Sequence, residues 1–359
     1  MVVRGVAPTT FVLLRATSHT HDVILIGQGL AGTVLSTTLR QRGLHVAVFD
    51  VPQEGRASEV AAGLVNPVSL RRTVLTWRAS EMLAIAGAFY RDLGLQYDQV
   101  FWHPMPLVAV FPTAQEAGIW QLRTKEADTG RFVRMDTVPH PALDALPQPY
   151  GRGIIDRCAW VDVSGLLAAH RRELRTSDGL REQQVKAEDI VRYEDGIAVY
   201  GAVAPLLVHC AGPFAEVHGL VPVKGEGLTV RIPGLELDRI VHRGVFLLPM
   251  GNEVYRVGAT FKWDDVWSGP SEEARHYLLD RTERLAEREV EVLDHWCGVR
   301  PASKDRRPLL GHIGPHEVVF NGLGSRGVVL APWCAQHLCA HLFEGKELDE
   351  EVRVGRFAQ

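Results

Sequence analysis

The chain has 359 residues, 46% of them hydrophobic, and its 39 lysines and arginines stand against 43 aspartates and glutamates, for a net charge of −4. A chain of this length can bury more than one core, so we expect two domains. The acidic balance excludes a global basic field that would gather nucleic acid or an anionic membrane, although a local basic patch remains compatible with it.

Cysteine usage and the N-terminal residues predict a cytoplasmic protein. The five cysteines include no CxxC pair, which is typical of reduced thiols and not of a disulfide framework or a zinc site. The histidines show no ligand spacing, so we expect no metal. No segment approaches the roughly 20 apolar residues of a membrane span. Because the apolar patch at residues 11–14 is too short for a signal peptide, we expect residues 1–20 to be a disordered tail or the product of a misplaced start codon.

Ordered structure is expected from Asp22 onwards. Residues 23–26 form a continuous apolar run that suits a strand buried on both faces. A glycine-rich turn, a helix over 30–42 and a second strand over 45–49 follow, which together make one βαβ unit.

The glycine-rich turn reads G-x-G-x-x-G at Gly27, Gly29 and Gly32. In such a turn the first glycine permits the tight bend, the second lets a pyrophosphate approach the backbone, and the third lets helix and strand pack closely. Asp50 ends the second strand, where a carboxylate can accept hydrogen bonds from an adenosine ribose. Strand, helix, strand and terminal acid in register predict dinucleotide binding, against the alternative of a glycine turn without a ligand.

Later elements are expected in both domains. Helices are predicted at 75–95, 115–125, 161–175, from 270 onwards and at 331–343, and strands within 100–111, 185–208, 222–260 and 318–320. No repeat and no low-complexity linker separates them, so we expect the two domains to interleave along the chain.

Five segments then carry a family resemblance. They are Ala61-Ala62-Gly63-Leu64-Val65-Asn66-Pro67, Pro222-Val223-Lys224-Gly225-Glu226, Tyr255-Arg256-Val257-Gly258-Ala259-Thr260-Phe261, Gly298-Val299-Arg300-Pro301 and Asn321-Gly322-Leu323-Gly324-Ser325-Arg326-Gly327. In this order, over residues 22–345, the chain resembles the D-amino-acid oxidase (DAO) superfamily of FAD-dependent oxidoreductases. Glycine oxidase and the oxidase half of the bacterial tRNA wobble-uridine modification enzyme are most similar. An NAD(P)-dependent dehydrogenase is the minor alternative.

The resemblance implies an α/β fold of the glutathione-reductase-2/DAO type, in which a Rossmann-type FAD-binding domain is interleaved with an antiparallel-sheet substrate domain. We expect the FAD-binding domain at residues 21–80, 150–221 and 296–345, and the substrate domain at 81–149 and 222–295. The cofactor is expected to be FAD. The implied FAD-binding residues are Gly27, Gly29, Leu30, Ala31, Gly32, Asp50, Ala62, Gly63, Leu64, Val185, Ala211, Gly212, Gly322, Gly324, Ser325, Arg326, Gly327 and Val328.

Three arginines are the implied catalytic residues. Arg300 matches the arginine that clamps the substrate carboxylate in amino-acid oxidases, and a guanidinium has the geometry for two parallel bonds to a carboxylate. The alternative is a structural pair with Asp305 or with another structural acid. Arg256 lies near the position of a basic residue that helps oxygen react with the reduced flavin in some relatives, or is a solvated strand residue. Arg326 is a second anion contact, a helix cap or a surface residue.

Cys297 lies in the region where sarcosine oxidases attach FAD covalently. Free cysteine is more often a small buried hydrophobe, so we expect non-covalent FAD.

The implied reaction is oxidation of the C–N bond of an amino acid or secondary amine. Hydride passes to flavin N5 and the imine is hydrolysed, so the flavin supplies the redox chemistry and the protein supplies orientation and charge. Oxygen or another acceptor takes the electrons. The alternatives are an oxidase acting on a carboxymethylaminomethyl group of tRNA, and a non-catalytic flavin-binding subunit. Nucleic acid is thus not the expected partner, but tRNA stays open.

Overall fold

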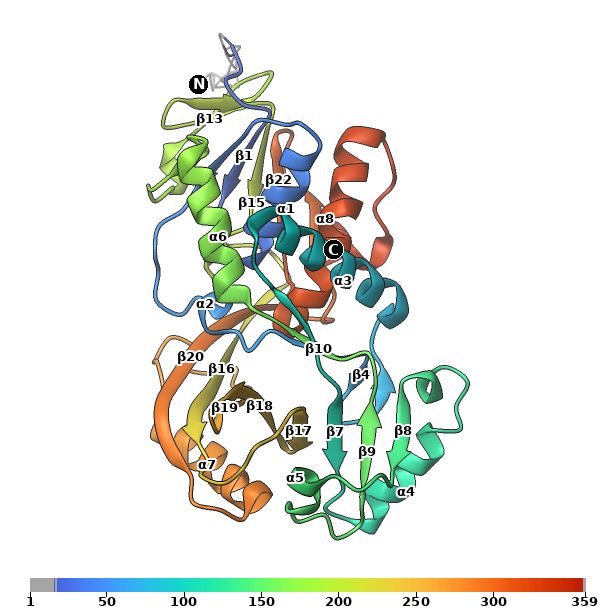
Figure 1. Ribbon diagram of the computed structural model, residues 1–359. Helices are drawn as coiled ribbons and strands as arrows, with labels where there is room; N and C mark the ends of the chain where they lie inside the picture. Colours follow the sequence, from blue (N-terminus) through green and yellow to red (C-terminus); the bar gives the residue numbers. More distant parts are fainter. Residues whose placement is uncertain (1–15, 17, 358–359) are drawn as a thin grey trace, which may run out of the picture.

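The computed structural model describes residue 16 and residues 18–357 (Figure 1). Most of the expected tail at residues 1–20 lies outside the described residues. Its last residue is attached to the fold, since the amide of Thr20 donates to the carbonyl of Val203 at 2.8 Å.

The upper part of the molecule in Figure 1 is built on a six-stranded sheet. Its order is β11 (Leu180–Arg181), β2 (Val46–Phe49), β1 (Val23–Ile26), β15 (Leu206–His209), β22 (Glu317–Asn321) and β21 (Leu309–His312). All neighbours are parallel except β21 and β22. The predicted βαβ unit is confirmed: β1 and β2 are buried apolar strands, joined by α1 (Leu30–Gln41).

Both faces of this sheet are covered, which explains the near-continuous apolar sequence of its strands. Residues that alternate along β1 and β2 pack on one side with α1, α3 (Ala79–Tyr97), α6 (Val163–Thr176) and α8 (Gly327–Glu344). On the other side they pack against the antiparallel hairpins of β12 (Ile190–Arg192), β13 (Ile197–Val199) and β14 (Ala202–Ala204).

The lower part is an eight-stranded sheet. Its order is β20 (Glu291–Ser303), β16 (Leu220–Arg231), β19 (Val254–Gly258), β18 (Val245–Gly251), β17 (Ile240–Arg243), β7 (Leu107–Val110), β9 (Arg152–Ile155) and β8 (Val133–Asp136). Only β17 and β7 run parallel. α7 (Glu272–Ala286) covers one face, and it begins at the predicted serine cap, where Ser271 accepts from the amide of Ala274.

The two faces of the eight-stranded sheet have different neighbours, because side chains alternate along each strand. Leu107, Ile240 and Leu248 pack in the same core cluster as the helices of the parallel-sheet domain. Val241 and Leu247 pack instead beneath α7. We call the first the front face and the second the back face.

The remaining elements are mostly short. They are α2 (Ala57–Val60), β3 (Leu64–Val65), β4 (Val68–Ser69), β5 (Val74–Leu75), β6 (Trp102–Pro104), α4 (Ala114–Arg123), α5 (Pro141–Asp144) and β10 (Ala159–Val161), with 3-10 turns at Thr129–Arg131, Ala187–Asp189, Gly212–Phe214, Gly324–Arg326, Glu350–Val352 and Val354–Phe357.

The domain boundaries in the structure differ from the expected ones. β9, expected within the FAD-binding segment 150–221, and the part of β20 from residue 296 on, expected within 296–345, lie in the eight-stranded sheet. α3, expected in the substrate segment 81–149, packs with Met82 and Leu93 in the core cluster that includes α8. Strand pairing and helix docking join residues far apart in sequence, so local patterns place such borders poorly. Within the described residues, no helix is long and apolar enough to cross a membrane.

Candidate functional site

The glycine turn has the geometry of a phosphate-binding turn. Gly27 has φ of +100°, and its amide donates to the carbonyl of Phe49 at 2.8 Å, so the turn is closed onto β2. A Cβ on Gly32 would lie 1.8 Å from the carbonyl oxygen of Gly27, so no other residue fits there. Gly29, the N-cap of α1, offers no side-chain cap to the helix amides. The amide of Leu30 donates instead to the hydroxyl of Ser58 at 3.0 Å, and the other amides of the first turn are available to an anion.

A second helix begins beside the first. A Cβ on Gly327, the first residue of α8, would be 3.0 Å from Leu30 at the start of α1, and α8 also has no side-chain cap. The side chain of Asn321 ties the adjoining loops together, since its amide donates to Gly212 at 2.8 Å and its carbonyl accepts from Gly322 at 2.9 Å. Two uncapped helix N-termini thus meet at the carboxyl edge of the parallel sheet, where negative charge is stabilised.

Of the remaining residues expected at the flavin end, Gly324 and Ser325 lie in the 3-10 turn before α8, and Val328 lies in its first turn. Ala211 lies at the end of β15, just before Gly212. The structure therefore brings these residues to the same edge as the glycine turn; their contacts with FAD remain predictions.

Asp50 lies at the end of β2 and is almost fully buried. It accepts from the amide of Gln28 at 2.8 Å and from Arg171 at 2.7 Å, and it also pairs with Arg56. Its expected contact with the ribose remains a prediction, because two arginines already hold the carboxylate. Sequence reasoning missed both arginines, since neither lies near the motif on the same element.

The loop expected beside the flavin ring packs against β10. A Cβ on Gly63 would be 2.0 Å from the carbonyl of Val161, because β3 pairs closely with β10. Ala62 and Leu64 flank this close approach, and both pack against the core of the parallel-sheet domain. Val185 packs with the cluster that contains Phe49 at the end of β2, so its expected adenine contact remains a prediction.

Arg300 lies on the front face of β20. Its Nη1 donates to the carbonyl of Thr260 at 3.0 Å, and its guanidinium lies 4.4 Å from the centre of the Phe261 ring. Within residues 16 and 18–357, no carboxylate lies within 4 Å of it. Burial lowers the pKa of Arg300 to about 10. The alternative pairing with Asp305 is wrong, because Asp305 pairs with Arg356 at 2.8 Å.

Arg326 is the residue before α8. Its Nη2 donates to the carbonyl of Asn66 at 3.0 Å, and no acid in the described part of the chain pairs with it. Burial, and then repulsion from Arg307, lowers the pKa of Arg326 to about 10. It is therefore a partly buried cation beside the N-terminus of α8, and not a fully exposed surface residue.

Arg256 is not a solvated strand residue. Its guanidinium donates to the carbonyl of Ala61 at 2.8 Å and to that of Val60, and it lies 4.7 Å from the ring centre of Trp296. Burial lowers its pKa. Both Nη groups of the guanidinium thus donate to the segment that leads to Ala62, Gly63 and Leu64, the loop expected beside the flavin ring.

Cys297 and Arg300 lie three residues apart on one strand and so point to opposite faces. Cys297 stands opposite Glu226 on the back face. This placement is unfavourable for a covalent bond from Cys297 to FAD bound on the front side.

His242 is a front-face residue that the sequence did not single out. It stands opposite Phe246, which in turn stands opposite Gly258 on β19. Burial lowers its pKa to about 4, so the imidazole is neutral at pH 7. The alternation in Ile240–Arg243 could have placed it, but only once the strand order was known.

These features agree with a comparison with known families. A family model described as DAO, FAD dependent oxidoreductase, matches residues 22–341. The chain belongs to the DAO family. Its cofactor is FAD, and the two uncapped helix starts and the glycine turn fit the group.

Curated relatives of this DAO protein include bifunctional proteins and a glycine oxidase. The bifunctional tRNA 5-methylaminomethyl-2-thiouridine biosynthesis protein MnmC of Marinobacter nauticus is 24% identical over 98% of this chain and 61% of its own length. Glycine oxidase of Pseudomonas aeruginosa is 24% identical over 90% of this chain and 95% of its own length. The chain thus spans a little over half of the first bifunctional relatives it matches.

Solved structures share the fold. Glycine oxidase from Geobacillus kaustophilus has a TM-score of 0.76 at 24% identity, covering 95% of this chain and 98% of its own. Iminodiacetate oxidase from a Chelativorans species has a TM-score of 0.77 at 20% identity, covering 94% of this chain and 98% of its own. The expected DAO-type fold is confirmed.

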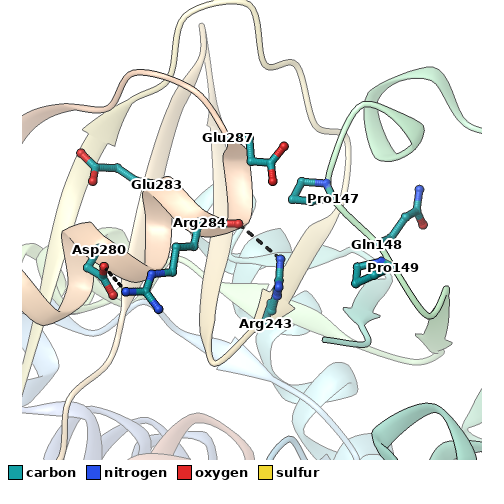
Figure 2. Close-up of a pocket in the computed structure, with 8 residues that line it drawn as sticks. All are labelled: Pro147, Gln148, Pro149, Arg243, Asp280, Glu283, Arg284 and Glu287. Carbon is teal, nitrogen blue, oxygen red and sulfur yellow. Dashed lines mark hydrogen bonds and ion pairs between the residues drawn. The ribbon is translucent and has the colours of Figure 1, made fainter. Parts of the chain in front are cut away.

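An open cavity of about 800 Å³ lies away from all of these residues (Figure 2). It is bounded by the loop at residues 147–149, by Arg243 and by the C-terminal half of α7, with Arg284 paired to Asp280 at 2.8 Å. Because α7 covers the back face, this cavity is separated from Arg300 by the sheet. No group of described residues could hold a metal ion.

Proposed function

We propose that this protein oxidises the C–N bond of an amino acid or secondary amine whose carboxylate is bound by Arg300. FAD, when bound, accepts the hydride, and the imine is hydrolysed in water. The observation that carries the proposal is the partly buried guanidinium of Arg300, which has no acidic partner in the described part of the chain.

A partly buried arginine without a carboxylate partner leaves donors available to an anion that enters from solution. Arg300 makes one hydrogen bond, to the carbonyl of Thr260, and a guanidinium has five donors. A substrate carboxylate can take up two of the remaining donors in parallel, which fixes its orientation as well as its charge. The protein would thereby aim the substrate at the flavin without acid–base catalysis of its own.

A second cation supports an anionic, amino-acid-like substrate. Arg326 places a partly buried positive charge near the start of α8, and no acid in the described part of the chain pairs with it. His242 lies on the same sheet face as Arg300, but β17 is separated from β20 by three strands, so His242 is not expected to reach a small substrate held by Arg300.

The second candidate is an oxidase for a carboxymethylaminomethyl group of tRNA, which also offers a secondary amine with a carboxylate. It is favoured by the match to MnmC over nearly the whole of this chain. A non-catalytic flavin-binding subunit is the third candidate. Oxygen or another acceptor would take the electrons in the first two.

The test begins with anaerobic addition of glycine, sarcosine, iminodiacetate and tRNA bearing the modified uridine to the FAD-loaded protein. Bleaching of the flavin by one of them identifies the substrate class, and no bleaching at full FAD occupancy favours the non-catalytic subunit. Acid precipitation shows whether the colour is released.

The variant Arg300→Ala tests the proposed carboxylate contact directly. For a carboxylate substrate we expect kcat/KM to fall by on the order of 10²–10³ through a raised KM, with FAD retained. Arg231→Ala, an exposed arginine paired with Glu291 on the same sheet, is the control and should change it by less than about twofold. Unchanged kinetics in Arg300→Ala would remove the proposed carboxylate contact.

A further inference from the structure

The segment from Arg56 to Ala61 is held at both ends by side chains from different domains. At its start, Arg56 pairs with Asp50 and donates to the carbonyl of Val51 at 2.8 Å. At its end, Arg256 of the eight-stranded sheet donates to the carbonyls of Val60 and Ala61. The segment therefore spans from the ribose end of the expected FAD site to the substrate sheet.

The middle of this segment contacts the phosphate turn. The hydroxyl of Ser58 accepts from the amide of Leu30, the first residue of α1, at 3.0 Å. Ser58 is also the nearest side chain to Gly29, at 3.3 Å from where a Cβ would be. α2, which contains Ser58, thus lies against the amides expected to bind the pyrophosphate.

Arg256 supplies hydrogen-bond donors at the C-terminal end of α2. The last carbonyls of a helix have no partner within the helix, and a cation there is favourable. The chain turns to an extended conformation at Ala61, so these carbonyls point away from any further helix. β20 closes the contact, because a Cβ on Gly298 would be 2.7 Å from Val60.

We propose that Arg256 is a positioning residue that holds the Val60 and Ala61 carbonyls and thereby couples the substrate sheet to the FAD site. Ala62, Gly63 and Leu64 follow directly, so the guanidinium fixes where the flavin-side loop begins. The face of Trp296, 4.7 Å away, supports the guanidinium on the side of the sheet. The oxygen-activating role that the family resemblance suggested would need a cation that is free to interact with oxygen. Both Nη groups of Arg256 instead donate to backbone carbonyls.

The test measures FAD binding to apoprotein, and Arg256→Met, Arg256→Lys and Arg231→Met are compared with the native protein. In Arg256→Met the stem remains but both donors are lost, so we expect the Kd for FAD to rise at least about tenfold. A lysine cannot serve two carbonyls in a fixed fork, so Arg256→Lys should give an intermediate rise. Arg231→Met should stay within about twofold of the native Kd.

Hydrogen exchange gives the second readout. Bound FAD should slow exchange of the amides at residues 56–64 in the native protein, and this protection should be reduced in Arg256→Met. If that variant does not fold, Arg256→Lys carries the same comparison.

Three outcomes would overturn the proposal. One is a native Kd for FAD with native exchange at residues 56–64. Another is a lowered Tm of the apoprotein with an unchanged Kd, which indicates a merely structural role. The third is slower reoxidation by oxygen with an unchanged Kd, which assigns Arg256 to the oxygen reaction. No amine enters these measurements, so they fail or succeed independently of the proposed substrate.

Discussion

The glycine turn after β1 and the front face of the eight-stranded sheet are built in opposite ways. The turn is local: Gly27 and Gly32 lie five residues apart, and their contact alone dictates glycine. The front face is assembled from β20, β16, β19, β18 and β17, so that Arg300 and His242 come from strands far apart in sequence. A site built from neighbouring residues can be recognised from the spacing of those residues in the sequence. A site assembled from distant strands can be recognised only once the strand register is known.

The largest effect is expected in the local site. In Gly32→Val the new side chain collides with the carbonyl of Gly27, since even a Cβ would lie 1.8 Å from it. The turn and the packing of α1 on β1 would both be lost, and we expect FAD retention to fall by more than about 100-fold. FAD content after gel filtration measures it.

Gly118→Ala is the control for this change, because nothing lies within 4 Å of a Cβ there. In helix α4 it should stabilise the protein by up to about 1 kcal/mol. A yellow Gly32→Val protein with native FAD content would show that the turn is not the phosphate site.

The back face of the assembled sheet should govern stability. Lys224 and Glu226 are both 1% exposed and lie 3.1 Å apart, and Glu226 also accepts from the amide of Ser271 at the start of α7. Glu226→Gln leaves an unpaired buried lysine, so we expect the free energy of unfolding to fall by about 3–5 kcal/mol. Urea denaturation measures it. A loss below about 1 kcal/mol would mean that the pair is not buried in solution.

The pH dependence of unfolding tests whether His242 is buried on the front face. Its pKa is lowered from 6.5 to about 4 in the folded protein, so the unfolded chain binds the extra proton between these values. The stability linked to His242 is therefore complete above pH 6.5 and is lost as the pH falls toward 4, by about 1–3 kcal/mol in total. His242→Gln should flatten the pH dependence of unfolding in this window. An identical slope in the variant would place the imidazole in water.

The smallest effect is expected at the cavity of Figure 2. Arg284 and Asp280 are paired at 2.8 Å, but their side chains are 75% and 51% exposed. Arg284→Ala should change stability by less than about 0.5 kcal/mol and should leave FAD binding and amine oxidation unchanged. A clear loss of activity in this variant would show that the cavity on the back face contributes to function.

The sequence by itself determined the dinucleotide turn, the DAO family and its FAD, and most helices. Those features depend on spacing within one or two elements, as with Gly27, Gly29 and Gly32, or with the serine cap of α7. Arg300 was found through the same kind of signal, a short string of the family.

Only the tertiary structure decided which faces these residues share. It placed β9 and β20 in the eight-stranded sheet, directed Cys297 away from Arg300, brought His242 to the front face and attached Arg256 to Val60 and Ala61. The physical reason is that a strand's register fixes the direction of every side chain on it, and register depends on partners that lie far away along the chain.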